Sequence, residues 1–263
     1  MNDLILSFVL GLIQGLTEFL PISSSAHLLF PSLIFGLNDL GLAFDISAHT
    51  GTLFAVIYYF RDDIRRMIKS LFQSNGPFIE DKNLAISLII ATIPIVLVGF
   101  FGSDLINQNR TNITSIAIMN LIFAGFLLLA FLYSSVSKKL IELTFIGAIF
   151  IGLFQVFALL PGASRSGTAI TAALLIGLNL KDASKFAFLL SIPTILGALV
   201  FLVIELSSSS YAINFPSLFI GFITSSLVAF LTIKYFLIFV NKIGMYPFVI
   251  YRIVLGIILL ILI

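Results

Sequence analysis

The sequence predicts an all-α, polytopic membrane protein, in which six transmembrane helices are combined with two re-entrant helical hairpins. Hydrophobic residues make up 60% of the 263 residues and charged residues only 10%, against roughly 25% in a typical soluble domain. Apolar stretches of membrane-spanning length recur along the chain, and two further apolar regions are each interrupted by a short polar segment. A soluble domain could not bury this much apolar surface, and a disordered chain would not contain it.

Six apolar stretches are long enough, within a few residues, to cross the hydrocarbon layer, which takes roughly 20 residues of helix. They are 42–60, 83–102, 113–133, 184–205, 216–236 and 247–263. The connection after residue 60 is rich in Lys and Arg, the one after 133 carries Lys138 and Lys139, and the one after 236 carries Lys242; the connection after 102 carries only Arg110 and the one after 205 carries none. Because cytoplasmic loops are rich in Lys and Arg, we expect the connections after residues 60, 133 and 236 on the cytoplasmic side.

The two interrupted regions are 4–37 and 145–178, and each is read as two half-length helices around a polar elbow. The first elbow is 20–25 (LPISSS) and the second elbow is 160–167 (LPGASRSG). Irregular backbone at membrane depth is tolerated only inside protein or beside a water-filled cavity. Each elbow is therefore either the buried tip of a re-entrant hairpin or a short loop outside the bilayer. Lys138 and Lys139 before the second region and Lys181 after it favour the re-entrant arrangement, which leaves the membrane on the side where it entered.

The two regions resemble each other and predict an internal repeat. Gly11-Leu12-Ile13-Gln14 is followed by Pro21 and Ser24, and Gly152-Leu153-Phe154-Gln155 is followed by Pro161 and Ser164. Each region precedes three spans, so a unit has odd parity and the second copy must insert upside down. We expect one membrane domain over 1–263, with inverted repeats at about 1–135 and 140–263. Chance likeness between two apolar segments with Gly and Pro is the alternative.

Glu18 and Arg165 are ionisable residues in or beside the elbows, and such a group within a membrane costs at least about 2.5 kcal/mol. If the elbows meet, the two side chains share one polar pocket. They then form either a buried ion pair that locks the hairpins together or an anion site in which the Arg165 fork grips the ligand. Hydroxyl groups and a helix start around Arg165 suit a phosphate cradle. By themselves they would favour a simple N-cap cluster, and the presence of Arg165 among them favours the cradle. The residues concerned are Ser164, Ser166, Gly167 and Thr168.

The first elbow supplies hydroxyl groups and a histidine. Ser23, Ser24 and Ser25 could each cap the following helix, and a helix starting near Ser24 would place His27 on the same face. That pair suits a nucleophile with its base, or an acid with the group that orients it, unless His27 is an ordinary buried histidine. Gln14 and Glu18 share a face of the preceding half-helix, where Glu18 could orient His27 or hold a divalent ion. Asp45 and His49, also four residues apart, are weaker candidates.

These segments resemble the two signatures of the undecaprenyl-diphosphatases, also called bacitracin-resistance proteins. The first is QGLTEFLPISSSAH over 14–27 and the second is PGASRSG over 161–167, and the likeness continues at 44–45, 51–52, 247–248 and 251–252. The resemblance implies a membrane hydrolase that converts undecaprenyl diphosphate into undecaprenyl phosphate and inorganic phosphate. This reaction recycles the lipid carrier of peptidoglycan synthesis and confers bacitracin resistance. The family fold is similar to that argued above, in the bacterial plasma membrane with the active site facing outward.

The resemblance also implies a set of site residues. The catalytic residues would be Glu18, Ser24, His27 and Arg165, with Gln14 at the Glu/Gln position beside the substrate. The elbow residues considered above, Ser23, Ser164, Ser166, Gly167 and Thr168, complete the expected substrate site. A divalent cation, Mg²⁺ or Ca²⁺, would be held by Glu18. Gln14 stands where relatives often have Glu, which weakens a two-carboxylate metal scheme, and Ala169 stands where many have Thr.

The competing function is a transporter or flippase for a polyprenyl phosphate, because inverted repeats with broken helices also suit alternating access. The Ser24 and His27 pair beside Glu18 favours an enzyme, since a carrier needs no proton relay. A net charge of +2 gives no reason to expect nucleic acid, and the absence of Cys excludes thiol chemistry and disulfides. The partners expected are the polyprenyl diphosphate and membrane lipids, and a homodimer is left open.

Overall fold

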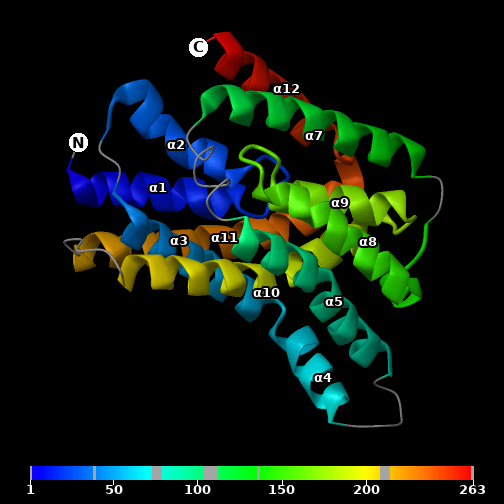
Figure 1. The fold of residues 1–263 in the computed structure, drawn as a ribbon. Coiled ribbons are helices and arrows are strands. Elements are labelled where there is room, and N and C mark those ends of the chain that lie inside the picture. The colour runs from blue at the N-terminus through cyan, green and yellow to red at the C-terminus, as the bar shows by residue number, and fades with distance from the viewer. Residues whose placement is uncertain are drawn as a thin grey trace.

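The computed structural model describes residues 2–37, 40–72, 79–102, 112–134, 137–207 and 214–261 (Figure 1). Within these ranges the regular structure is helical, apart from an isolated bridge between Lys138 and Leu178. The α-helices are α1 (Asp3–Thr17), α2 (Ser24–Phe35), α3 (Leu42–Tyr59), α4 (Arg61–Leu71), α5 (Ile79–Phe101), α7 (Ile113–Tyr133), α8 (Phe145–Gln155), α9 (Arg165–Leu175), α10 (Leu180–Ser207), α11 (Phe215–Ile243) and α12 (Tyr246–Ile261). The 3₁₀-helices are η1 (Leu140–Glu142) and η2 (Val156–Leu159). Arg110 and the last two residues of the predicted span 247–263 lie outside the described residues.

A helix lies at each of the six predicted spans. Four of them, α5, α7, α10 and α11, are long and apolar enough to cross a membrane within the described residues. The predicted span 113–133 coincides with α7, whereas α10 and α11 extend beyond the predictions 184–205 and 216–236. At the remaining predictions, 42–60 and 247–263, α3 has 18 residues and α12 has 16 described residues. The chain is therefore an all-α protein with several membrane-spanning helices.

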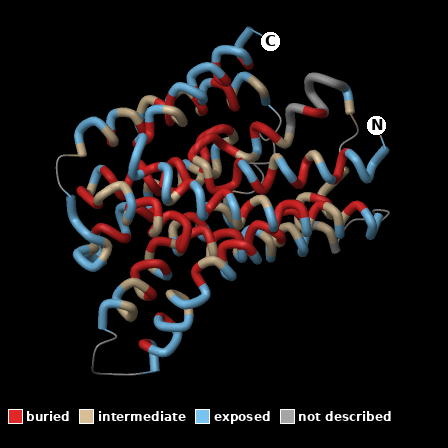
Figure 2. The backbone as a smooth tube through the Cα atoms, turned by 180° about the vertical axis from the view of Figure 1, so that it is seen from behind, coloured by how far each residue is buried: buried red, intermediate tan, exposed pale blue. Residues whose placement is uncertain are grey.

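The outer surface of the protein is apolar and suits contact with lipid. Large apolar side chains face outward, such as Phe101 at 82% exposed and Ile146 at 80%, whereas Gln14, Gln155 and Arg252 are fully buried. Figure 2 shows the buried residues gathered in the interior of the bundle. An apolar exterior around buried polar side chains is the arrangement expected of a protein whose outer surface meets hydrocarbon.

Both interrupted regions break at their elbows, as the sequence predicts. The first breaks after α1 and resumes with α2, and the second breaks after α8 and η2 and resumes with α9. The residue before each resumed helix, Ser23 or Ser164, has a positive φ, of 72° and 70° respectively. An L-residue adopts this left-handed conformation only when its surroundings fix it, so both turns are closely determined by their contacts. At about 1.5 Å per residue, α9 spans only about 16 Å, half the thickness of the hydrocarbon layer.

The matching of the two elbows differs from the sequence alignment by one residue. The sequence placed Ser24 opposite Ser164, because both follow a proline by three residues. The backbone instead pairs Ser23 with Ser164, and this register also pairs Gln14 with Gln155. In both elbows the positive-φ serine lies beside the hydroxyl of the serine two residues later, at 3.2 Å for Ser23 and Ser25 and at 3.3 Å for Ser164 and Ser166. The helix starts, and not the prolines, are therefore the equivalent positions.

Small residues let helices approach closely where the hairpins pack. A Cβ on Gly15 of α1 would lie 2.8 Å from the Ser225 carbonyl oxygen of α11, and one on Gly152 of α8 would lie 2.6 Å from that of Ala91 in α5. Contact through glycine is typical of helices that pack without a hydrophobic driving force. These contacts, together with α9 packed among α7, α8 and α10, hold the elbows in the middle of the bundle.

The basic segment after residue 60 is a helix and not a loop. In α4, Arg66 pairs with Asp63 at 2.6 Å, and Lys185 near the start of α10 pairs with the same carboxylate at 2.7 Å. The segment after 60 and the start of α10 therefore lie at the same end of the molecule, as the distribution of cations predicts. Figure 1 shows α4 projecting away from the body of the bundle beside the start of α5.

Candidate active site

The two elbows bring Glu18 and Arg165 together, although the residues are 147 positions apart in the sequence. Glu18 follows the last residue of α1, and Arg165 is the first residue of α9. Arg165 Nη2 donates to Glu18 Oε1, and the Glu18 side chain is only 2% exposed. A carboxylate this deeply buried needs a cation and further hydrogen bonds to stay ionised, and the site provides both.

The second oxygen of Glu18 has two donors from the first half of the chain. Gln14 Nε2 lies 3.0 Å and Ser24 Oγ 2.7 Å from Glu18 Oε2. The Gln14 contact follows from the i, i+4 spacing on α1, as predicted. Ser24 reaches the carboxylate because the turn at Ser23 folds the start of α2 back over the end of α1. Glu18 is therefore the centre of the cluster, with a separate group on each side.

His27 has different partners from the one expected. Its Nδ1 lies 2.7 Å from the carbonyl oxygen of Ser23, and its Nε2 lies 2.5 Å from the hydroxyl of Tyr251 in α12. His27 shares a helix with Ser24, yet the hydroxyl of Ser24 is directed to Glu18. In this arrangement Glu18, and not His27, is the group placed to accept the Ser24 proton.

The hydroxyl groups of the second elbow mostly hold the backbone. Ser164 Oγ accepts from the Gly167 amide at 3.2 Å, as a helix N-cap does, and Thr168 Oγ1 donates to the Arg165 carbonyl at 2.9 Å. Ser166 Oγ donates to the Leu20 carbonyl of the first elbow at 2.9 Å. The N-cap alternative thus describes Ser164, while Ser166 ties the elbows together. Gly167 is needed for space, because a Cβ there would lie 2.9 Å from a guanidinium nitrogen of Arg252.

Arg252 holds both elbows, and the sequence analysis did not select it as a functional residue. Its guanidinium donates to the carbonyls of Pro21 at 3.3 Å, Gly162 at 2.9 Å and Ala163 at 3.1 Å. Its Nε donates to Asn120 Oδ1 at 2.9 Å, and the Asn120 amide returns a bond to the Arg252 carbonyl at 2.7 Å. The signal was present, because Arg252 is a charged residue inside the apolar stretch 247–263. It is the side chain that fixes how the elbows face each other.

His49, which the sequence made only a weaker candidate for the site, lies close to Glu18. Its Nε2 is 3.9 Å from Glu18 Oε2, and its Nδ1 is 2.8 Å from the Asp45 carbonyl oxygen. His49 therefore belongs to the surroundings of Glu18. The contact of Asp45 with His49 is made by its backbone oxygen.

The donor set fits a divalent ion only in part. Among the described residues, no three Asp, Glu, His or Cys side chains gather as a metal site. Glu18 and Gln14 do offer oxygen, and Gln14 Oε1 is buried without a hydrogen-bond partner. Hard cations such as Mg²⁺ are commonly held by one or two protein oxygens together with substrate phosphate. The residues present fit that kind of site and not an ion held by the protein alone.

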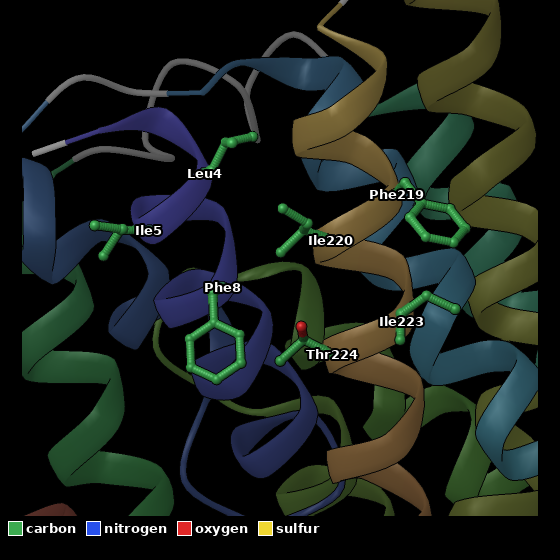
Figure 3. Close-up of a pocket in the computed structure, with 7 residues that line it drawn as sticks. All are labelled: Leu4, Ile5, Phe8, Phe219, Ile220, Ile223 and Thr224. Carbon is green, nitrogen blue, oxygen red and sulfur yellow. The ribbon is translucent and has the colours of Figure 1, made fainter.

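An apolar pocket of about 410 Å³ lies between α1 and α11, toward the start of α1 (Figure 3). It is lined by Leu4, Ile5, Phe8, Phe219, Ile220, Ile223 and Thr224. Ten residues of helix, about 15 Å, separate Phe8 from Glu18, so the pocket is distinct from the polar cluster. Its lining suits a hydrocarbon chain.

Known proteins resemble the chain over almost its whole length. The family model described as bacitracin resistance protein BacA matches residues 7–258. A protein named undecaprenyl-diphosphatase from Alcanivorax borkumensis is 45% identical over 256 residues, which is 97% of each chain. Proteins of the same name from Saccharophagus degradans and Teredinibacter turnerae are 45% and 46% identical, covering 97% and 98% of this chain and 96% and 99% of their own.

Proposed function

The chain belongs to the bacitracin resistance protein BacA family, and on that premise we propose that it hydrolyses undecaprenyl diphosphate to undecaprenyl phosphate and inorganic phosphate. The reaction recycles the lipid carrier used in cell-wall synthesis and confers resistance to bacitracin. The observation that carries this function in the structure is the meeting of Glu18 and Arg165 between the elbows. The flippase alternative is not favoured, because the relatives of this chain are named as phosphatases.

Arg165 is the residue that binds the diphosphate. Its guanidinium donates a hydrogen bond to Glu18 Oε1 and another to Thr194 Oγ1 at 3.3 Å. A diphosphate carries more negative charge than one carboxylate and presents paired oxygens that match the guanidinium fork, so it competes for the same donors. When the phosphate takes Arg165, Glu18 loses its cation and becomes a stronger proton acceptor for Ser24.

Two routes to hydrolysis follow from this geometry. In the first, Ser24 Oγ attacks the terminal phosphorus, its proton passes to Glu18 Oε2, and undecaprenyl phosphate leaves; water then hydrolyses the phosphoserine. In the second, water attacks the terminal phosphorus directly, its proton passes to His27, and the bond to the bridging oxygen breaks so that undecaprenyl phosphate leaves; Ser24 Oγ donates a hydrogen bond to a phosphoryl oxygen. In both, stabilisation of the phosphoryl oxygens by Arg165 supplies most of the catalysis. A divalent ion that entered with the diphosphate would take ligands from Glu18 and Gln14 and would neutralise phosphoryl charge.

The proposed membrane arrangement is six spans and two re-entrant hairpins in inverted repeats, in the bacterial plasma membrane. Its support is mutual packing of the halves. The first-half hairpin helix α1 packs on α11 of the second half, and the second-half hairpin helix α8 packs on α5 of the first half. This exchange is what two interlocked inverted copies produce. The active site then opens toward the outer side, with the prenyl tail against apolar surface such as the α1 and α11 pocket.

Phosphate release tests the function. The purified protein in detergent is given a prenyl diphosphate, with Mg²⁺, with Ca²⁺ or with a chelator, and inorganic phosphate is measured. We expect release by the wild-type protein, loss with the chelator, and at least tenfold lower release by His27→Ala. No release by the wild-type protein with either ion would contradict the proposal, since no gradient exists in detergent and transport is not involved.

Label transfer separates the two routes. The substrate is labelled with ³²P at the terminal phosphorus, the reaction is quenched within one turnover, and protein-bound label is counted. Label on the wild-type protein and none on Ser24→Ala supports the phosphoserine. Full activity without bound label supports direct attack by water.

A further inference from the structure

His27 is held at both nitrogens of its ring. Nδ1 lies 2.7 Å from the Ser23 carbonyl oxygen, and Nε2 lies 2.5 Å from the hydroxyl oxygen of Tyr251. The two rings are also stacked, with centroids 5.6 Å apart and planes inclined by 12°. The imidazole therefore has its position and its plane fixed by two residues that come from opposite ends of the sequence.

The direction of these hydrogen bonds follows from the chemistry of the partners. A carbonyl oxygen can only accept, so Nδ1 of His27 must carry hydrogen and donate to Ser23. Neutral imidazole has one N–H group, which leaves a lone pair on Nε2. The hydroxyl of Tyr251 must then donate to Nε2.

We propose that Tyr251 is a positioning residue for His27, fixing the plane and the tautomer of the imidazole for phosphate hydrolysis. The inference rests on the proposed function, because His27 is taken to serve that reaction. The contact survives protonation: a proton on Nε2 is donated to the phenolic oxygen, which accepts while its own hydrogen turns away. Tyr251 thus holds the ring in both of its charge states.

The helix that carries Tyr251 is itself anchored to the site. Arg252, the next residue in α12, donates to carbonyls of the first elbow and of the second. The hydroxyl of Tyr251 therefore keeps a fixed position relative to the first elbow, which leads directly into the helix α2 that carries His27. A tyrosine on an unanchored helix could not set the ring to the accuracy that proton transfer needs.

Kinetics of Tyr251→Phe test the role, because phenylalanine keeps the stacked ring and removes only the hydroxyl. We expect kcat to fall about tenfold with KM within about twofold, since a less well oriented histidine loses part of the roughly 10²–10⁴-fold that a positioned acid or base contributes. Tyr246→Phe is the matched control: it makes the same change in the same helix, at a ring that packs on Phe131. In a His27→Gln background, Tyr251→Phe should cause no further loss. An unchanged kcat, or the same loss without His27, overturns the proposal.

Nitrogen NMR provides a readout that does not depend on activity. The chain has two histidines, so ¹⁵N-histidine labelling gives signals from His27 and His49 alone. We expect hydrogen on Nδ1 of His27 in the wild-type protein, and a shifted Nε2 signal in Tyr251→Phe while the His49 signals stay unchanged. A wild-type His27 with hydrogen only on Nε2, or a His27 spectrum unaffected by Tyr251→Phe, overturns the proposal. Phosphate release by the wild-type protein is measured separately, so failure of the proposed function is recognised as such.

Discussion

At the scale of single residues, the site is organised around one buried carboxylate. Glu18 receives hydrogen bonds from Gln14 and Ser24 on one oxygen and from Arg165 on the other. A buried ion pair offsets its desolvation cost only when such additional bonds are made. The resting pair therefore keeps Arg165 charged, oriented and available to the diphosphate.

Arg165→Lys should separate charge from geometry at this position. Lysine keeps the positive charge but lacks the planar fork that grips two oxygens, so we expect kcat/KM for the prenyl diphosphate to fall at least about 100-fold. The measurement is phosphate release in detergent. The control is Arg65→Lys, the same change in an exposed residue of α4, which should leave the rate unchanged. Turnover near that of the wild-type protein in Arg165→Lys would argue against a bidentate clamp.

The sequence predicts the charged residues of the site, because burying a charge in a membrane is costly. It does not predict which partners a side chain contacts, because these depend on the local backbone conformation. Glu18 and Arg165 stand out in any hydropathy analysis, because each is an isolated charge at an interruption. The partners of Ser24 and His27 depend on the positive φ of Ser23, which no spacing rule reveals. Arg252 stands out as a charge in an apolar stretch, but its role is not predictable from the sequence, because the elbow carbonyls that it binds carry no sequence signature.

At the scale of elements, α12 ties the two hairpins together through Arg252. Arg252→Met keeps an unbranched side chain but leaves the carbonyls of Pro21, Gly162 and Ala163 without this donor. Because hydrogen bonds to a charged group are worth about 1.5–3 kcal/mol each, we expect the free energy of unfolding to drop by roughly 3 kcal/mol or more. Thermal unfolding in detergent measures this. In Arg61→Met, at the exposed start of α4, the free energy of unfolding should stay within about 0.5 kcal/mol of the wild-type value. Equal stability of the two variants would show that Arg252 does not stabilise the packing of α12 on the elbows.

The contact of α1 with α11 depends on Gly15. In Gly15→Ala the new methyl group would lie 2.8 Å from the Ser225 carbonyl oxygen and from Val228 Cβ, so the helices must separate, which typically costs about 1–3 kcal/mol. Gly125→Ala in α7 is the matched control, because a Cβ there has no neighbour within 4 Å. Alanine should stabilise that helix slightly. A melting temperature that falls in Gly15→Ala and rises slightly in Gly125→Ala would support the close contact. A shift in the same direction in both variants would contradict it.

Element boundaries were predictable where hydropathy changes sharply. The span 113–133 coincides with α7, and both elbows lie where proline, glycine and serine interrupt an apolar run. The helix α4 was missed because its segment is strongly charged, and a search for spans assigns charge to loops. Asp63 pairs with Arg66 within α4, whereas its pair with Lys185 forms only once α10 is in place.

At the scale of the whole molecule, the apolar composition indicates a lipid environment, and the order of hairpins and spans leads to the proposed topology. A re-entrant hairpin followed by three spans ends on the side opposite to its start, so two such units run in opposite directions. In the proposed topology both termini lie on the outer side of the membrane, together with the starts of α3, α7 and α11. In Figure 1 the two termini lie at the same end of the view as the starts of these helices.

The orientation can be measured by cysteine labelling, since the natural chain contains no cysteine and each introduced thiol is the only one. Asn2→Cys and Phe215→Cys should react in intact cells with a membrane-impermeant maleimide, because both positions lie at the start of helices that enter from the outer side in the proposed topology. Lys139→Cys and Arg65→Cys, on the side rich in Lys and Arg, should react only after the membrane is opened. Labelling of Lys139→Cys in intact cells would place the second hairpin on the outer side. The two units would then insert in the same direction, and the inverted arrangement would be excluded.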